Sequence, residues 1–208
     1  MSYLTQRRRA LLAAMGGNKA LPYDAEIEYL WSTGAQFIDT GIIPTSSTGI
    51  GIEITNGSNT DNYFCGLRND SGNTRWCIGT SLRLYAAYGS VIDTSSSDKP
   101  NGTFPCYLNY LNSKKFTSSV SQKEYDLPSL PFTPLYNIRL FGSAGVSAGY
   151  ARWSGKIHWA KISDGESIIM DLIPVRVGSV GYMYDKISGR LLGNDGTGNF
   201  VLGNDITN

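Results

Sequence analysis

Two pairs of carboxylates have a spacing that could support catalysis. Glycoside hydrolysis uses two carboxyl groups about 5–10 Å apart, and residues two positions apart on a β-strand share one face. Glu124 and Asp126 have this spacing, but Pro128 follows and ends any strand there. Asp24 and Glu26 also have it, although they precede the first expected strand. Neither pair is favoured as a catalytic centre, and we predict that the chain is not an enzyme.

A single histidine, His158, limits the other catalytic devices. A Ser-His-Asp or Cys-His arrangement would have to use this residue, and no G-x-S-x-G motif precedes a helical segment. His158 lies inside residues 156–162, whose composition predicts a strand. We therefore interpret it as a strand residue on one face of a sheet.

The candidate metal ligands are few. Cys65, Cys77 and Cys106 are the three cysteines, and no C-x-x-C spacing is present. This pattern argues against a zinc site and a disulfide scaffold, and it favours a reducing compartment. Residues 194–199, NDGTGN, offer oxygen atoms that calcium accepts, but the same residue types build turns. A turn is the favoured interpretation and calcium the alternative, so we predict no metal and no cofactor.

Aromatic residues are the strongest candidates for recognition, because the chain contains 13 tyrosines and four tryptophans. Such side chains either fill the core of a β-sandwich or stack on sugar rings, and the sequence leaves both roles open. Those in or near expected strand ends and loops are the candidate glycan-binding residues: Trp76, Tyr85, Tyr88, Tyr150 and Trp153.

Charge is distributed unevenly, although the net charge is only +1. Residues 1–19 contain four of the 18 basic residues and no acidic one, which leaves 14 basic against 17 acidic residues in the remainder. The body of the chain is therefore not expected to bind nucleic acid. The apolar run at residues 10–15 is six residues long, shorter than the roughly 7–15 of a signal peptide or the roughly 20 of a membrane helix. We predict neither export by such a signal nor membrane insertion.

The basic segment is predicted to be a helical arm. Residues 5–15 are largely helix formers, and Gly16 and Gly17 favour a helix end directly after them. A helix of this length is marginal in water, so we expect it to dock on a partner, with a solvated basic tail as the alternative. The expected organisation is an anchoring arm, residues 1–22, followed by one domain, residues 23–208. The candidate partner-anchoring residues are Arg7, Arg8, Arg9, Leu11, Leu12 and Met15.

The domain itself is predicted to be all-β. From residue 26 onward, short alternating runs are separated by clusters of Gly, Asn, Asp and Ser, and no segment has a convincing helical period. Many short strands with turn signals at this spacing predict a sandwich or jelly roll. The expected strands cover residues 36–40, 50–54, 63–67, 75–79, 81–85, 104–108, 135–141, 156–162 and 200–202.

One predicted hairpin allows its register to be derived. The strands on either side of Ser71 would place Cys65 opposite Cys77, and Gly66 opposite Trp76, where the glycine makes room for the indole ring. Directly opposed cysteines could form a disulfide in an oxidising medium. The favoured interpretation is that Cys65 and Cys77 are two small apolar residues packed side by side.

Segments at both ends of the domain carry a more specific pattern. EYLWSTGAQFIDTG, residues 28–41, resembles the opening EYIxSTGxQYIDTG of a family of laminin-G-like, concanavalin A-like jelly-roll domains. DLIPVR at residues 171–176, GYMYDKISG at 181–189 and NDGTGNF at 194–200 resemble the end of the same domains, which closes in NxGTGxF. The resemblance spans about residues 23–205, and its middle part matches only in strand rhythm.

The resemblance implies a sandwich of two antiparallel sheets in which the first and last strands pair, with a hairpin turn at residues 185–189. Such domains are frequent in phages of gut bacteria, often in virion proteins, and the resemblance carries no catalytic residues. The implied function is that of a phage virion structural protein, as a capsid decoration, head fibre or tail-associated protein. The alternative is a carbohydrate-binding adhesion module for host-surface or mucosal glycans.

Residues 1–22 would then bind other virion proteins, with Arg7 to Arg9 meeting acidic groups. A homo-oligomer is expected because virion appendages repeat by symmetry. The expected location is the virion surface, after assembly in the cytoplasm of the bacterial host.

Overall fold

A computed structural model describes residues 20–56, 62–68, 75–80, 83–92, 101–121, 123–128, 133–145 and 153–206. The helix expected over residues 5–15 lies outside this set. Within it, the regular elements are β-strands and one short 3-10 turn, η1 (Tyr110–Asn112). The prediction of an all-β domain is confirmed.

The strands form two antiparallel sheets. The larger sheet contains, in spatial order, β10 (Tyr125–Asp126), β9 (Lys115–Ser118), β8 (Thr103–Leu108), β4 (Thr48–Asn56), β12 (Ser154–Asp164), β13 (Ser167–Val177), β14 (Val180–Asp185) and β15 (Leu191–Leu192). Three short strands extend it: β1 (Ala25–Glu26) pairs with β13, β2 (Leu30–Thr33) pairs with β12, and β16 (Val201–Leu202) pairs with β2. The smaller sheet has the order β3 (Ile38–Asp39), β11 (Arg139–Leu140), β5 (Asn62–Leu67), β6 (Arg75–Thr80) and β7 (Leu84–Ile92).

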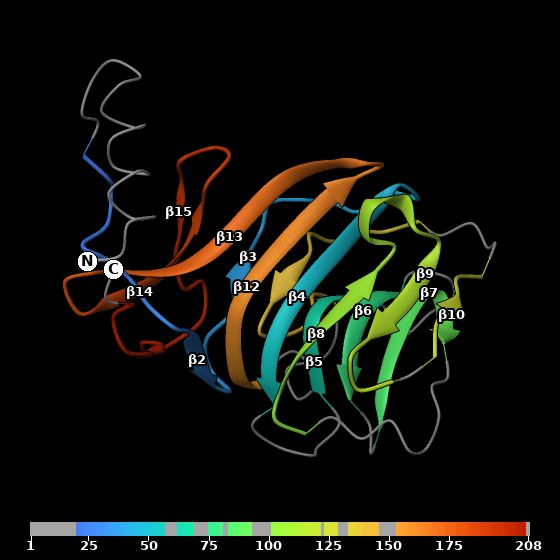
Figure 1. Ribbon diagram of the computed structural model, residues 1–208, viewed down its shortest axis with the longest axis horizontal. Helices are drawn as coiled ribbons and strands as arrows, with labels where there is room; N and C mark the ends of the chain where they lie inside the picture. Colours follow the sequence, from blue (N-terminus) through green and yellow to red (C-terminus); the bar gives the residue numbers. More distant parts are fainter. Residues whose placement is uncertain are drawn as a thin grey trace, which may run out of the picture.

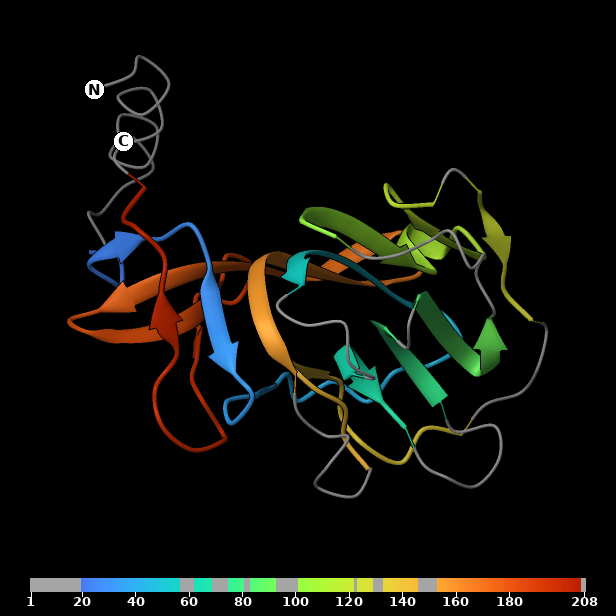
Figure 2. The same cartoon turned by 90° about the horizontal axis from the view of Figure 1, so that it is seen from below.

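The two sheets pack face to face around one main core, as Figure 2 shows from the side. Phe64 of the smaller sheet lies 6.3 Å from Phe104 of the larger sheet and 4.8 Å from Trp153, between ring centroids. Alternation along the strands explains this layering, because every second side chain of a strand points to the same face. In β8, Phe104, Cys106 and Leu108 are buried, whereas the residues between them are partly exposed.

The other face of the larger sheet carries no second sheet among the described residues, and η1 covers one end of it at Gly49 and Ser163. Ile50, Ile52 and Ile54 of β4 belong to the core, so the residues between them lie on the outer face. Among the described residues, no third layer covers this face, which is turned toward the viewer in Figure 1.

The two ends of the domain close the larger sheet together, as the resemblance implied. Val201 pairs with Trp31, and Ala25 pairs with Arg176 of β13. An isolated bridge joins Ile27 to Asp205. In Figure 1 the first and last strands accordingly lie beside the β13–β14 hairpin.

The opening and closing motifs also bind each other through a polar turn. The Asn194 side-chain oxygen accepts a hydrogen bond from the Phe37 N–H at 3.2 Å, and the Asp195 carboxylate accepts one from the Asp39 N–H at 2.8 Å. The backbone N–H of Asp195 donates to the Phe37 carbonyl at 2.9 Å. Residues 194–199 therefore act as a turn that fastens the first motif, which is the favoured interpretation of this segment.

The predicted register of the β5–β6 hairpin is wrong by one residue. Tyr63 pairs with Gly79 as expected, but a β-bulge at Phe64 then places Cys65 opposite Ile78 and Gly66 opposite Cys77. The shift turns the two cysteines to opposite faces of the sheet, because side chains alternate along a strand. Cys65 lies in the inter-sheet core and Cys77 in a small outer cluster, and both thiols are free.

Gly66 is required at this bulge for a reason other than the one expected. Its φ is +124°, and a Cβ there would lie 2.2 Å from the Trp76 carbonyl oxygen and 2.5 Å from the Cys77 Cα. The glycine therefore makes room for the backbone of β6 and not for the indole ring.

Most of the other expected strands are present. The predictions at residues 50–54, 104–108 and 156–162 fall inside β4, β8 and β12. The strand expected at residues 81–85 overlaps β7 only at its end, and β11 is much shorter than the predicted 135–141. The turn at residues 185–189 joins β14 to β15, as expected.

Candidate functional site

The sequence-predicted glycan-binding residues are mostly core residues. Trp76 and Trp153 are fully buried, and Tyr88 is 5% exposed. Trp76 is opposite Tyr88 on neighbouring strands, and Trp153 packs on Phe141 with ring centroids 6.1 Å apart. A sugar cannot reach these three rings in the folded domain, so their prediction as glycan-binding residues is wrong.

Of the other two candidates, the structure describes only Tyr85. Tyr85 packs beside the outer cluster of the smaller sheet, and its ring lies edge-on to Tyr63 with centroids 5.8 Å apart. Burial, followed by the neighbouring Cys77 and Tyr63, strongly raises the pKa of Tyr85. Tyr150 lies outside the described residues.

Three of the four carboxylates considered for catalysis have contacts within the fold. Glu124 forms an ion pair with Lys115, and Glu26 accepts a hydrogen bond from the Tyr23 hydroxyl at 3.0 Å. Asp24 accepts a hydrogen bond from the Gly178 N–H at 2.7 Å. The Asp24 contact ties the start of the described chain to the end of β13.

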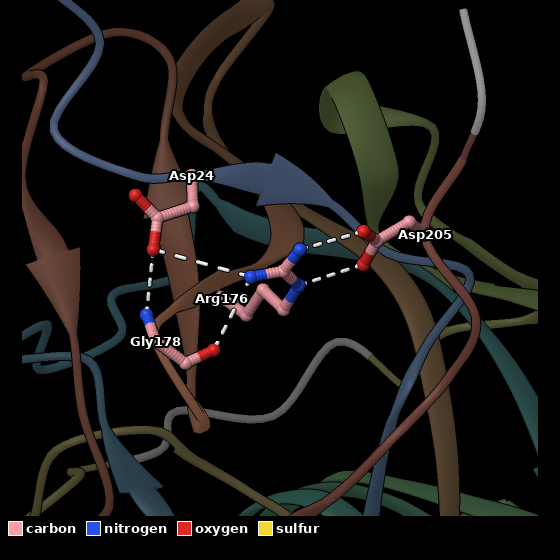
Figure 3. A network of polar contacts seen from close by, with 4 residues as sticks. All are labelled: Asp24, Arg176, Gly178 and Asp205. Carbon is pink, nitrogen blue, oxygen red and sulfur yellow. Dashed lines mark hydrogen bonds and ion pairs between the residues drawn. The ribbon is translucent and has the colours of Figure 1, made fainter.

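Asp24 belongs to a polar clamp at the place where both chain ends meet. Arg176 donates from Nε and Nη2 to the two carboxylate oxygens of Asp205, at 2.7 and 2.6 Å, and its Nη1 lies 3.9 Å from Asp24 (Figure 3). The hydrogen bond from Arg176 holds the pKa of Asp205 below its usual value. The clamp fastens strand β13 to a residue near each end of the described chain.

His158 has a structural role on the outer face of the larger sheet, as the strand interpretation expected. Its Nδ1 lies 3.0 Å from the Glu28 carbonyl oxygen and its Nε2 lies 2.8 Å from the Thr55 hydroxyl. Burial lowers the pKa of His158, so the ring is neutral near pH 7. A neutral imidazole has one donor and one acceptor nitrogen, so Nδ1 donates to the carbonyl and Nε2 accepts from Thr55. Both nitrogens are used within the fold.

An aromatic group near the middle of the outer face is the best candidate for recognition. Tyr107 of β8 lies between Tyr110 of η1 and Trp159 of β12, with ring centroids 5.5 and 6.2 Å away. All three side chains are partly exposed. We call these three residues the aromatic platform.

A glycine allows the platform rings to approach each other. Gly51 of β4 lies between β8 and β12, directly opposite Tyr107. A Cβ at this position would lie 3.0 Å from Tyr107 Cδ1 and 3.4 Å from Trp159 Cζ3. The two rings therefore lean over the backbone of Gly51 from opposite sides, and they cover a position where a side chain would otherwise stand.

A β-bulge brings Trp159 to this face. The pairing of β12 with β4 runs from Ile157–Ile54 to Trp159–Glu53 and skips His158. Because of this irregularity, both His158 and Trp159 contact outer-face residues, namely Thr55 for His158 and Tyr107 for Trp159.

Two charged residues, Glu53 and Lys161, are neighbours of the platform in the strand pairing. Glu53 is opposite both Pro105 and Trp159, and its side chain has no hydrogen bond or ion pair within the described part of the chain. Burial raises the pKa of Tyr107, with smaller contributions from Tyr110 and from the charge of Glu53. Lys161, opposite Gly51, forms an ion pair with Asp171 at 3.4 Å.

A second aromatic group on the same face is occupied by the chain's own cation. Lys156 Nζ lies 3.9 Å from the ring centroid of Tyr29 and 5.7 Å from that of Trp31. Such cation–π contacts stabilise the lysine over the rings. Among the described residues, no cation–π contact is formed to Tyr107 or Trp159, which distinguishes the platform from this second group.

The chemistry that the platform offers is non-covalent: aromatic faces, and a Glu53 carboxylate with no donor among the described residues. Within the described ranges, no three His, Cys, Asp or Glu side chains come together as a metal site would require. The same residues contain no helix long and apolar enough to cross a lipid bilayer.

Strands that carry the platform residues were predicted from the sequence, but the proximity of these residues to each other was not. Alternation in residues 50–54 and 104–108 would have assigned Gly51, Glu53 and Tyr107 to one face. Placing them beside Trp159 also requires the strand order β8-β4-β12 and the bulge at His158. A comparison with protein-family models and with curated proteins found no match.

Proposed function

We propose that this chain is a non-catalytic structural protein of a bacteriophage virion, in which residues 23–208 form a concanavalin A-like jelly-roll domain displayed on the particle surface. The observation that carries the proposal is that the two terminal motifs contact each other. The segments that resemble the laminin-G-like phage family bind each other through Asn194, Asp195 and the β2–β16 pair. They are therefore determinants of the closed sheet, as the resemblance implies for that family.

The proposed attachment runs through residues 1–22. Both ends of the described chain lie at the β13–β14 end of the larger sheet, where Arg176 holds Asp24 and Asp205. A domain tied down at this end keeps the outer face of its larger sheet free. We propose that Arg7 to Arg9 meet acidic groups on another virion protein and that Leu11, Leu12 and Met15 pack against it.

Charge reversal in the arm tests this proposal on the full chain. The variant Arg7→Glu, Arg8→Glu, Arg9→Glu is compared with Lys114→Glu, Lys123→Glu, Arg190→Glu, which makes the same charge change at three exposed positions of the domain. Co-sedimentation is measured with particles of the phage that encodes the chain. We expect the arm variant to lose attachment and the control variant to keep it.

The proposal would be overturned if the chain is missing from purified particles. Attachment that survives the arm variant and fails in the control would instead assign docking to the domain surface.

Carbohydrate recognition is the second candidate function, and the aromatic platform favours it. Three aromatic rings lie together on the outer face, beside the Glu53 carboxylate, which has no hydrogen-bond or ion-pair partner among the described residues. The two functions are compatible, because a displayed domain can also adhere to glycans on the host surface or in mucus.

A further inference from the structure

We propose that Tyr107, Trp159 and Glu53 form a binding site for a neutral pyranose ring of an oligosaccharide. This inference rests on carbohydrate recognition as the second candidate function, and it names residues that differ from those predicted from the sequence. Its starting point is the outer face of the larger sheet, which no other layer of described residues covers.

The platform matches the apolar face of a sugar. Tyr107 and Trp159 are partly exposed and tilted by 42° to each other, with centroids 6.2 Å apart. A pyranose presents C–H groups on its face and hydroxyl groups around its edge. Aromatic side chains offer a large apolar surface with few degrees of freedom to lose on binding.

Gly51 is the reason that the two rings lie close to the backbone of β4. Because Gly51 has no side chain, both rings lean over the strand between them. A Cβ at Gly51 would lie only 3.0 Å from Tyr107 and 3.4 Å from Trp159. A larger residue at Gly51 would push the rings away from each other and break the continuous surface.

Glu53 supplies the polar contact. It lies opposite Trp159, and its carboxylate oxygens have no donor within the described residues. A sugar hydroxyl is a suitable donor, because hydrogen bonds to a charged acceptor are stronger than those between neutral groups.

The charges around the site favour a neutral sugar. Lys161, the residue opposite Gly51, forms an ion pair with Asp171 at 3.4 Å and therefore already has an anionic partner. Glu53 has no cationic partner within the described ranges, and its carboxylate would repel that of a sialic or uronic acid.

The test uses the full chain on an array of neutral glucan, mannan and galactan oligosaccharides, together with sialylated and uronic-acid glycans. We expect binding to neutral glycans, with affinity at least about tenfold lower in Trp159→Ala and in Tyr107→Ala. Glu53→Gln should also weaken binding. Trp31→Ala is the matched control, since Trp31 lies on the same sheet face beside Lys156 and should leave binding unchanged.

Trp159→Tyr separates a lost ring from a misfolded protein, because it keeps an aromatic face and should retain most of the affinity. The inference is overturned if no neutral glycan binds, if only acidic glycans bind, or if binding survives both alanine variants. Co-sedimentation of Trp159→Ala with virions distinguishes the two proposals. Attachment of this variant supports the virion role whether or not a glycan is bound.

Discussion

Asp185 shows how a buried carboxylate can organise a turn. It is 2% exposed and accepts hydrogen bonds from the N–H groups of Asp171, Ile187 and Ser188 and from the Ser188 hydroxyl, at 2.6 to 3.2 Å. Burial acts to raise the pKa of Asp185, but these hydrogen bonds outweigh it and hold the pKa below its usual value. The charged form is therefore the one that stabilises the β14–β15 turn.

Replacing this carboxylate should have a pH-dependent effect. Asp185→Asn keeps the shape but loses part of the acceptor capacity, and we expect about 2–4 kcal/mol less free energy of unfolding at pH 7. Because the folded pKa is depressed, the stabilisation is present above the unfolded pKa of about 3.9 and is lost as the pH falls through the folded value. Urea unfolding at pH 7 and near pH 3 should show the difference shrink in acid.

The control is Asp126→Asn, since Asp126 is exposed. Its effect should stay within about 0.5 kcal/mol at both pH values. An equal loss of stability for Asp185→Asn at pH 7 and pH 3 would show that shape, and not charge, matters at this turn.

The aromatic residues show the limit of assigning function from residue type. Trp76 and Trp153 lie in or near expected strand ends, as an exposed sugar-binding tryptophan could, yet both are buried. Trp153 is held by the Phe64 and Phe141 rings and donates a hydrogen bond to Asn56 at 3.3 Å. These neighbours come from distant parts of the chain, so local sequence could not distinguish a core indole from an exposed one.

At the scale of elements, the β5–β6 hairpin determines how reactive Cys65 and Cys77 are. Its bulge places Cys65 and Cys77 on opposite faces, and burial raises the pKa of Cys77 to about 12 and that of Cys65 further. At pH 8 both groups are therefore protonated thiols with low reactivity.

Thiol counting tests this geometry. After incubation in an oxidising buffer, we expect three thiols to react with a disulfide reagent in denaturant, and much slower reaction in the native protein. A single remaining thiol, with Cys65 and Cys77 joined in one peptide pair, would contradict the observed register.

Strand positions were easier to predict than strand boundaries and pairing. β4 and β12 follow from their alternating apolar residues, whereas β13 was identified only as a motif. β13 contains Pro174, and a proline argues against a central strand because it lacks an N–H. The Pro174 carbonyl accepts from Ile27 at 3.1 Å, so its nitrogen faces the β1 side and not the β14 ladder. That tolerance depends on the pairing partner, which residues 171–176 do not specify.

On the scale of the whole molecule, the clamp and the platform lie in different places. Asp171 marks the level of the platform on β13, because it forms an ion pair with Lys161, the residue opposite Gly51. It is five residues from Arg176 along β13, a separation of roughly 17 Å. From Asp171, the platform lies beyond β12. In Figure 1, β4 and β12 lie between β8 and β2. The proposed attachment at one end and the proposed recognition on the outer face therefore involve different surfaces.

The four tryptophans offer the most direct test of recognition on the outer face. Trp76 and Trp153 lie in the core, whereas Trp31 and Trp159 lie on the outer face of the larger sheet. The indole N–H signals of the ¹⁵N-labelled full chain, assigned by single Trp→Phe variants, would be recorded while neutral glucan, mannan and galactan oligosaccharides are added. We expect the Trp159 signal to shift with one of them while the other three stay in place. A shift confined to Trp31, or four signals that no neutral glycan moves, would contradict recognition at the aromatic platform.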